Sequence, residues 1–205
     1  MVVVMKNGLK LLEEYMTTWD MLYNESRPPH LRSPRIPDPD PSVQTIFDRY
    51  AAINAKYSRL ANIRDLILEL EASRDRFIHA LTGIERGWSD VSGAADEASW
   101  SPRELTEHLT FSEGAGLWIA CSAIGLEAPY LLAYLPNFQT KEEGIEGVIA
   151  MGETCAPIYA QIRDLDLRKP VESPFGIAWE QTVWGVLVRN ITHADEHAAT
   201  IGGFD

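Results

Sequence analysis

The chain has 205 residues, 45% of them hydrophobic, and a formal net charge of −12. This length suits one domain with a sizeable core, and the acidic charge argues against nucleic-acid binding, which needs a basic surface. No segment approaches the roughly 20 apolar residues of a membrane span, and the short apolar start lacks the basic region of a signal peptide. Because only two cysteines are present, we expect no disulfide framework and a cytoplasmic location.

The first part of the chain predicts an extension that precedes the main domain. Residues 8–24 have helical apolar spacing, and the proline-rich segment 27–41 favours extended chain. We therefore divide the chain into residues 1–41, an N-terminal helix and proline-rich strap, and residues 42–205, the main domain. Helical spacing resumes over 42–81, with a break expected near residues 54–62.

The clearest local signal is the start of a helix at Pro102. Ser101 suits the N-cap, Pro102 suits the first helical position, and Glu104 completes a capping box. We expect this helix to run to about residue 124, where Gly125 ends it.

The remaining elements are also helical. Segment 125–139 has no strong period, a helix follows Thr140 and continues to about residue 162, and the last helix covers 183–201. No strand-like alternation of any length occurs. The predicted class is all-α, with four core helices in a bundle.

Three histidines suggest a metal site. His193 and His197 are four residues apart on the last helix, so their rings lie roughly 6 Å apart along one face and can reach one ion. His108 lies one turn beyond Leu105, at the edge of the apolar stripe of its own helix. Histidine nitrogen is a common zinc ligand, and three protein ligands leave the open position that a catalytic metal needs.

This metal hypothesis imposes a topology. His108 is near the start of the second core helix, and the histidine pair is near the end of the fourth. The three can meet only if these helices are antiparallel, which requires an up-down-down-up bundle with a crossover at about 125–139. An extended segment of that length spans about 50 Å, more than enough for the return along a helix of about 35 Å.

The same topology places several loop and helix residues near the mouth of the site. Trp88, Trp100 and Phe138 are pocket candidates, although simple packing is the commoner role for such aromatic residues. Glu107 and Glu196 are nearby carboxylates, which we assign to solvated helix faces ahead of acid–base roles.

Three stretches of the sequence resemble the DinB-like superfamily: Trp100 to Leu109, Pro174 to Gly176, and Ile191 to Ile201. The resemblance covers roughly residues 60–203. It implies an up-down-down-up four-helix bundle, a divalent metal (commonly zinc or nickel) on His108, His193 and His197, and a homodimer. Some relatives are transferases or isomerases that use an external low-molecular-weight thiol, and others are hydrolases. Thr200 stands where the family often carries glutamine, which makes Thr200 a further pocket candidate.

Two functions are therefore expected, both with a small-molecule partner and neither with nucleic acid or membrane. The first is a metal-dependent transferase or hydrolase that activates a thiolate or water on the three histidines. The alternative is a non-catalytic metal- or ligand-binding bundle, acting in stress response or as a dimeric interaction module. An inverted zinc peptidase is disfavoured, because only eight residues follow His197.

Overall fold

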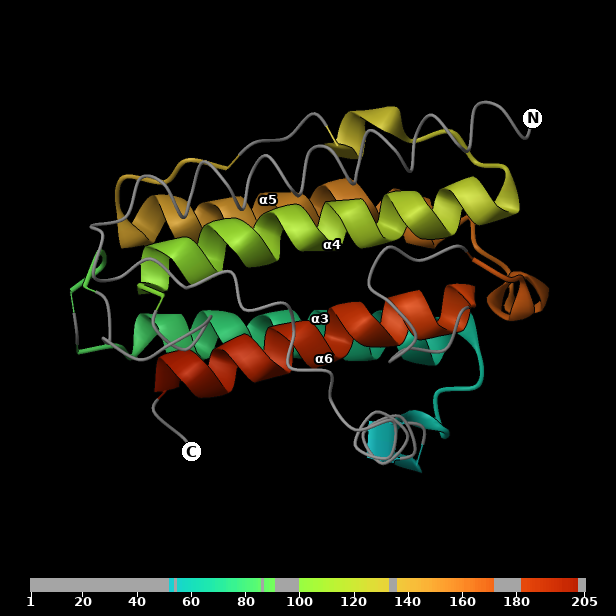
Figure 1. Ribbon diagram of the computed structural model, residues 1–205, viewed down its shortest axis with the longest axis horizontal. Coiled ribbons are helices and arrows are strands. Elements are labelled where there is room, and N and C mark those ends of the chain that lie inside the picture. Colours follow the sequence, from blue (N-terminus) through green and yellow to red (C-terminus); the bar gives the residue numbers. More distant parts are fainter. Residues whose placement is uncertain are drawn as a thin grey trace, which may run out of the picture.

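The computed structural model describes most of the chain after residue 51 (Figure 1). The described ranges are residues 52–53, 55–85, 87–90, 100–132, 136–171 and 182–202. The extension predicted over residues 1–41 lies outside them, as does the Pro174 to Gly176 stretch of the family resemblance.

The described residues are predominantly helical, which confirms the all-α class. Their long helices are α3 (Ile63–Thr82), α4 (Pro102–Ile124), α5 (Lys141–Tyr159) and α6 (Val183–Gly202). Two short 3-10 helices, η3 (Pro129–Leu132) and η4 (Asp164–Arg168), lie in the connections. Within these ranges the only β-type pairing is a single bridge between Pro170 and Thr182.

Helix boundaries follow from local chemistry. α4 begins with the capping box expected from Ser101 and Glu104, and it ends at Gly125, whose φ of 81° favours glycine. The predicted break in the 42–81 pattern is also present, since residues 58–59 form a turn before Asn62 caps α3. α5 ends at Tyr159, two residues after Pro157 and earlier than the expected residue 162.

Helix α5 begins with only half of a capping box. The Thr140 side chain accepts a hydrogen bond from the Glu143 backbone. The Glu143 carboxylate, however, accepts from the backbone N–H of Gln139. The cap therefore fixes the residue before the helix as well as its first turn.

The long helices pack side by side, with α3 and α4 each packed against both α5 and α6. Figure 1 shows α4 and α5 running in one direction and α3 and α6 in the opposite direction. The segment that connects α4 to α5 contains η3 and returns along the length of the molecule on the outer side of these two helices. This arrangement brings the start of α4 beside the end of α6, where the three histidines lie.

The interior contains two clusters of buried apolar side chains. The larger cluster includes Leu117, Leu187 and Ile191 and joins the long helices to the segment before α3. The smaller cluster lies at the histidine end of the helices, and its members are Phe77, Leu81, Leu105, Leu109, Val148, Ala194 and Ile201. The second cluster forms the apolar wall beside the histidines.

No helix among the described residues combines the length and the apolar character needed to cross a membrane.

Candidate metal centre

Helix α4 positions His108. The capping box at Ser101 satisfies backbone N–H groups of the first turn, a type of contact worth about 1 kcal/mol. Leu105 and Leu109, on either side of His108 in the sequence, are buried in the smaller apolar cluster. His108 itself is partly buried, and its ring packs against the Trp100 ring in a T-shaped arrangement with ring centroids 5.1 Å apart.

Helix α6 positions the other two histidines. Its first turn is held by Thr182, whose hydroxyl accepts a hydrogen bond from the Gly185 backbone. His193 and His197 are only 5% and 3% exposed. They are buried because α3 and α4 both pack against α6.

A second set of contacts holds the histidine turn of α6 against α3 and the segment before it. Asp195, between the two histidines in the sequence, accepts hydrogen bonds from Arg76 at 2.8 Å and from the Tyr57 hydroxyl at 3.2 Å. These contacts fix the rotation of α6 about its axis. They therefore help to set where the imidazoles of His193 and His197 point.

The three imidazoles converge on one point. Nε2 of His193 lies 3.0 Å from Nε2 of His108 and 2.8 Å from Nε2 of His197. One potential ligand atom from each residue lies within 4.8 Å of the others. His193 and His197 follow His108 by 85 and 89 positions in the sequence, yet the three side chains meet at a single centre.

Burial keeps these imidazoles neutral. It lowers the pKa of His108 to about 3, with a further contribution from the positive charge of Arg189. Burial also lowers the pKa of His193 and of His197 well below the usual range, and Arg189 and the neighbouring histidines add to the effect. At neutral pH each ring therefore keeps one nitrogen lone pair available to a metal ion.

Two other candidates lie on α6 near the histidines. Glu196 is exposed and accepts a hydrogen bond from Arg189 at 3.1 Å. The Thr200 hydroxyl donates to the Glu196 backbone carbonyl at 3.0 Å. Helical geometry places both candidates, together with Arg189, on one side of His193, the side that faces away from Ala194.

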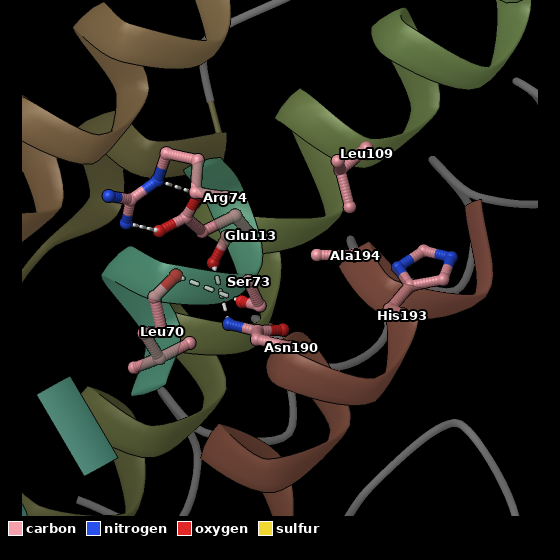
Figure 2. A pocket seen from close by; sticks show the side chains of 8 residues that line it. All are labelled: Leu70, Ser73, Arg74, Leu109, Glu113, Asn190, His193 and Ala194. Carbon is pink, nitrogen blue, oxygen red and sulfur yellow. Dashed lines mark hydrogen bonds and ion pairs between the residues drawn. The ribbon is translucent and has the colours of Figure 1, made fainter. Parts of the chain in front are cut away.

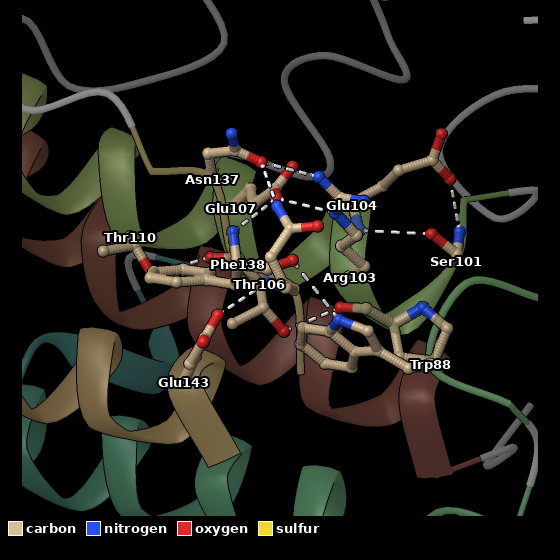
Figure 3. A network of polar contacts seen from close by, with 12 residues as sticks. Trp88, Ser101, Arg103, Glu104, Thr106, Glu107, Thr110, Asn137, Phe138 and Glu143 are labelled. Carbon is tan, nitrogen blue, oxygen red and sulfur yellow. Dashed lines mark hydrogen bonds and ion pairs between the residues drawn. The ribbon is translucent and has the colours of Figure 1, made fainter. Parts of the chain in front are cut away.

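The structure brings Trp88, Glu107 and Phe138 together in a separate network on another face of α4 (Figure 3). Glu107 Oε1 accepts from the Phe138 backbone N–H and from Arg103 Nε, both at 2.9 Å. Trp88 Nε1 donates to the Phe138 carbonyl at 3.4 Å. The solvated position expected for Glu107 is wrong: the side chain is buried because the end of the 125–139 connection docks over it.

The sequence did not reveal a buried polar network behind His193. Arg74 of α3 donates to Glu113 of α4 through Nη2 at 2.6 Å and through Nε at 3.2 Å. Asn190 of α6 donates to the Glu113 carbonyl at 3.2 Å and to the Tyr159 hydroxyl at 3.5 Å. One signal was available, since Arg74 interrupts the apolar stripe of its helix.

Comparison of the chain with protein-family models, with curated proteins and with solved structures finds no match.

Proposed function

We propose that the protein binds a divalent metal ion on His108, His193 and His197, within an up-down-down-up four-helix bundle formed by α3, α4, α5 and α6. The observation that carries this proposal is the convergence of three Nε2 atoms, at 3.0 and 2.8 Å, in a largely buried site. Buried neutral imidazoles with facing nitrogens need either shared protons or a common cation.

The donor set fits a first-row metal. With zinc–nitrogen bonds of about 2.0–2.1 Å, two ligands of a tetrahedral site lie about 3.3 Å apart. The His193–His108 and His193–His197 separations of 3.0 and 2.8 Å are slightly shorter, and all three ligand atoms lie within 4.8 Å of one another, so ring rotations would be needed to place them at equal distances from one ion. Imidazole ligands suit both zinc and nickel.

Three protein ligands favour a catalytic role over a purely structural one, because structural zinc sites have four. When bound, such a metal supplies a Lewis acid that lowers the pKa of a water or thiol in its open position. The chain's own residues orient the ligands: Trp100 packs on His108, and Asp195 fixes the turn that carries the other two. On this basis we propose a metal-dependent transferase or hydrolase.

If the reaction uses a thiol, the thiol comes from outside the chain. Cys121 and Cys155 are both free and buried, and burial raises the pKa of Cys121 to about 11. Cys121 also lies thirteen residues beyond His108 on α4, roughly 20 Å along the helix axis.

Metal analysis of the purified chain tests the proposal. We expect one equivalent of metal in the wild type and its loss in His193→Ala. His79→Ala is the matched control, because His79 is exposed on α3 and is expected to leave the metal content unchanged. A wild type that takes up no zinc or nickel would refute the site.

Turnover assays then separate catalysis from binding. The metal-loaded wild type is assayed with small thiols and model electrophiles, and with ester and amide substrates. A rate above that of His193→Ala supports an enzyme. A metal-loaded protein without any such rate supports the alternative, a non-catalytic metal-binding protein.

A further inference from the structure

A small cavity lies beside His193, and neither His108 nor His197 is among the residues that line it (Figure 2). It is lined by Leu70, Ser73, Arg74, Leu109, Glu113, Asn190, His193 and Ala194. The cavity leaves about 10 Å³ for the centre of a water molecule. That space is close to the minimum that one water needs.

Two buried polar atoms border this cavity without a protein partner. Nε2 of His193 faces the other histidines, so the ring nitrogen that Figure 2 shows directed toward Ala194 is Nδ1. Within the described part of the chain, no hydrogen bond involves Nδ1 of His193 or Oδ1 of Asn190. These side chains are 5% and 8% exposed, and buried polar groups are rarely left unsatisfied.

If the proposed function holds, Nδ1 of His193 needs a hydrogen-bond acceptor. If Nε2 of His193 binds a metal, the single proton of the neutral ring lies on Nδ1, which becomes a donor that needs an acceptor. Histidine ligands in metal sites almost always donate this N–H to a carboxylate, a carbonyl or a water. Among the described residues no protein group accepts a hydrogen bond from Nδ1 of His193, and His193 borders the cavity instead.

We propose that this cavity binds one structural water, which accepts the Nδ1–H of His193 and donates to Oδ1 of Asn190. The effect of this water on metal affinity rests on the proposed function, whereas the presence of the water in the cavity does not. Ser73 offers the water a second acceptor, because its hydroxyl already donates to the Leu70 carbonyl. The water then makes the three hydrogen bonds typical of buried waters.

Asn190 is the positioning residue of this arrangement. Its amide nitrogen is fixed by the Glu113 carbonyl and the Tyr159 hydroxyl, which orients the oxygen. Gly116 of α4 packs against this amide, and a β-carbon there would overlap Oδ1. The buried Arg74–Glu113 pair closes the adjacent wall. Together these contacts hold Oδ1 of Asn190 in place as an acceptor for the proposed water, and that water then favours the His193 tautomer that presents Nε2 to a metal.

A crystal structure of the metal-free full chain, at a resolution that shows ordered waters, tests the hydration site directly. We expect one water within hydrogen-bond distance of both His193 Nδ1 and Asn190 Oδ1. A dry cavity, or a protein group bonded to Nδ1, would overturn the proposal.

Cobalt(II) titration tests the coupling to the metal. Asn190→Leu removes the amide oxygen at similar side-chain size, and we expect cobalt affinity to fall 10- to 100-fold. Ile191→Val is the control, since Ile191 is buried on the same helix but does not line the cavity. We expect this variant to bind cobalt within about twofold of the wild type. Equal affinities for Asn190→Leu and the wild type would overturn the coupling.

Asn190→Ala separates positioning from packing. Alanine leaves room for a second water that replaces the lost amide oxygen, so its cobalt affinity should lie between those of the wild type and Asn190→Leu. If Asn190 acts only by filling space, Asn190→Ala should bind cobalt more weakly than Asn190→Leu, because alanine leaves the larger cavity. Failure of the wild type to bind cobalt would refute the proposed function. The crystal structure of the metal-free chain would still show whether a water lies at Nδ1 of His193.

Discussion

Replacing Glu113 by glutamine removes one charge of the buried pair with Arg74 while keeping nearly the same shape. The Arg74 and Glu113 side chains are 14% and 11% exposed, and their closest atoms are 2.6 Å apart. Removing one partner of such a pair leaves an uncompensated buried charge, which costs about 3–5 kcal/mol. We therefore expect Glu113→Gln to lose that much unfolding free energy.

Urea unfolding followed by circular dichroism measures this loss. At a typical denaturant dependence of about 2 kcal/mol per molar, the midpoint should fall by about 1.5–2.5 M. Arg59→Gln is the control, because its pair with Glu69 involves an arginine that is 66% exposed and should contribute at most about 1 kcal/mol. Combining Arg74→Met with Glu113→Gln should restore most of the stability, since the unpaired charge is then gone. If Glu113→Gln loses no more unfolding free energy than Arg59→Gln, the buried pair does not stabilise the fold in this way.

Two further predictions follow from pKa shifts. Burial raises the pKa of Cys121 to about 11 and that of Cys155 further. At pH 8 neither thiol should therefore react with a disulfide reagent until the protein unfolds. Rapid reaction of the native protein would contradict this expectation. The folded protein holds the pKa of His108 near 3, against 6.5 when unfolded, so below pH 6.5 the unfolded state binds more protons. The metal-free protein should therefore lose up to about 1.4 kcal/mol of stability per pH unit from this group as the pH falls from about 6.5 toward 3. His108→Gln should show a shallower dependence in urea unfolding at several pH values, and equal slopes would contradict the shift.

Local chemistry made the helix boundaries predictable. The capping box at Ser101 and the stop at Gly125 depend on residues within a few positions of each other, and both are present. The sequence also offered His108, His193 and His197 as one site, and axial position along the helices set the condition that the helices carrying them be antiparallel. The three Nε2 atoms do converge.

Contacts between distant segments were not predictable in this way. Glu107 is buried because Phe138, 31 residues later, donates to its carboxylate. Arg74 was visible as a break in an apolar stripe, but its partner Glu113 lies 39 residues away and has no local signature. Asn190 likewise takes its role from Gly116 and Tyr159 on other helices.

X-ray absorption at the metal edge of the metal-loaded full chain tests the three-histidine site most directly. We expect three imidazole nitrogens at about 2.0–2.1 Å for zinc, with the multiple scattering of imidazole rings and no sulfur from the chain. His108→Gln should reduce the imidazole count. A spectrum with only oxygen ligands, or with a sulfur ligand from Cys121 or Cys155, would rule out the three-histidine site.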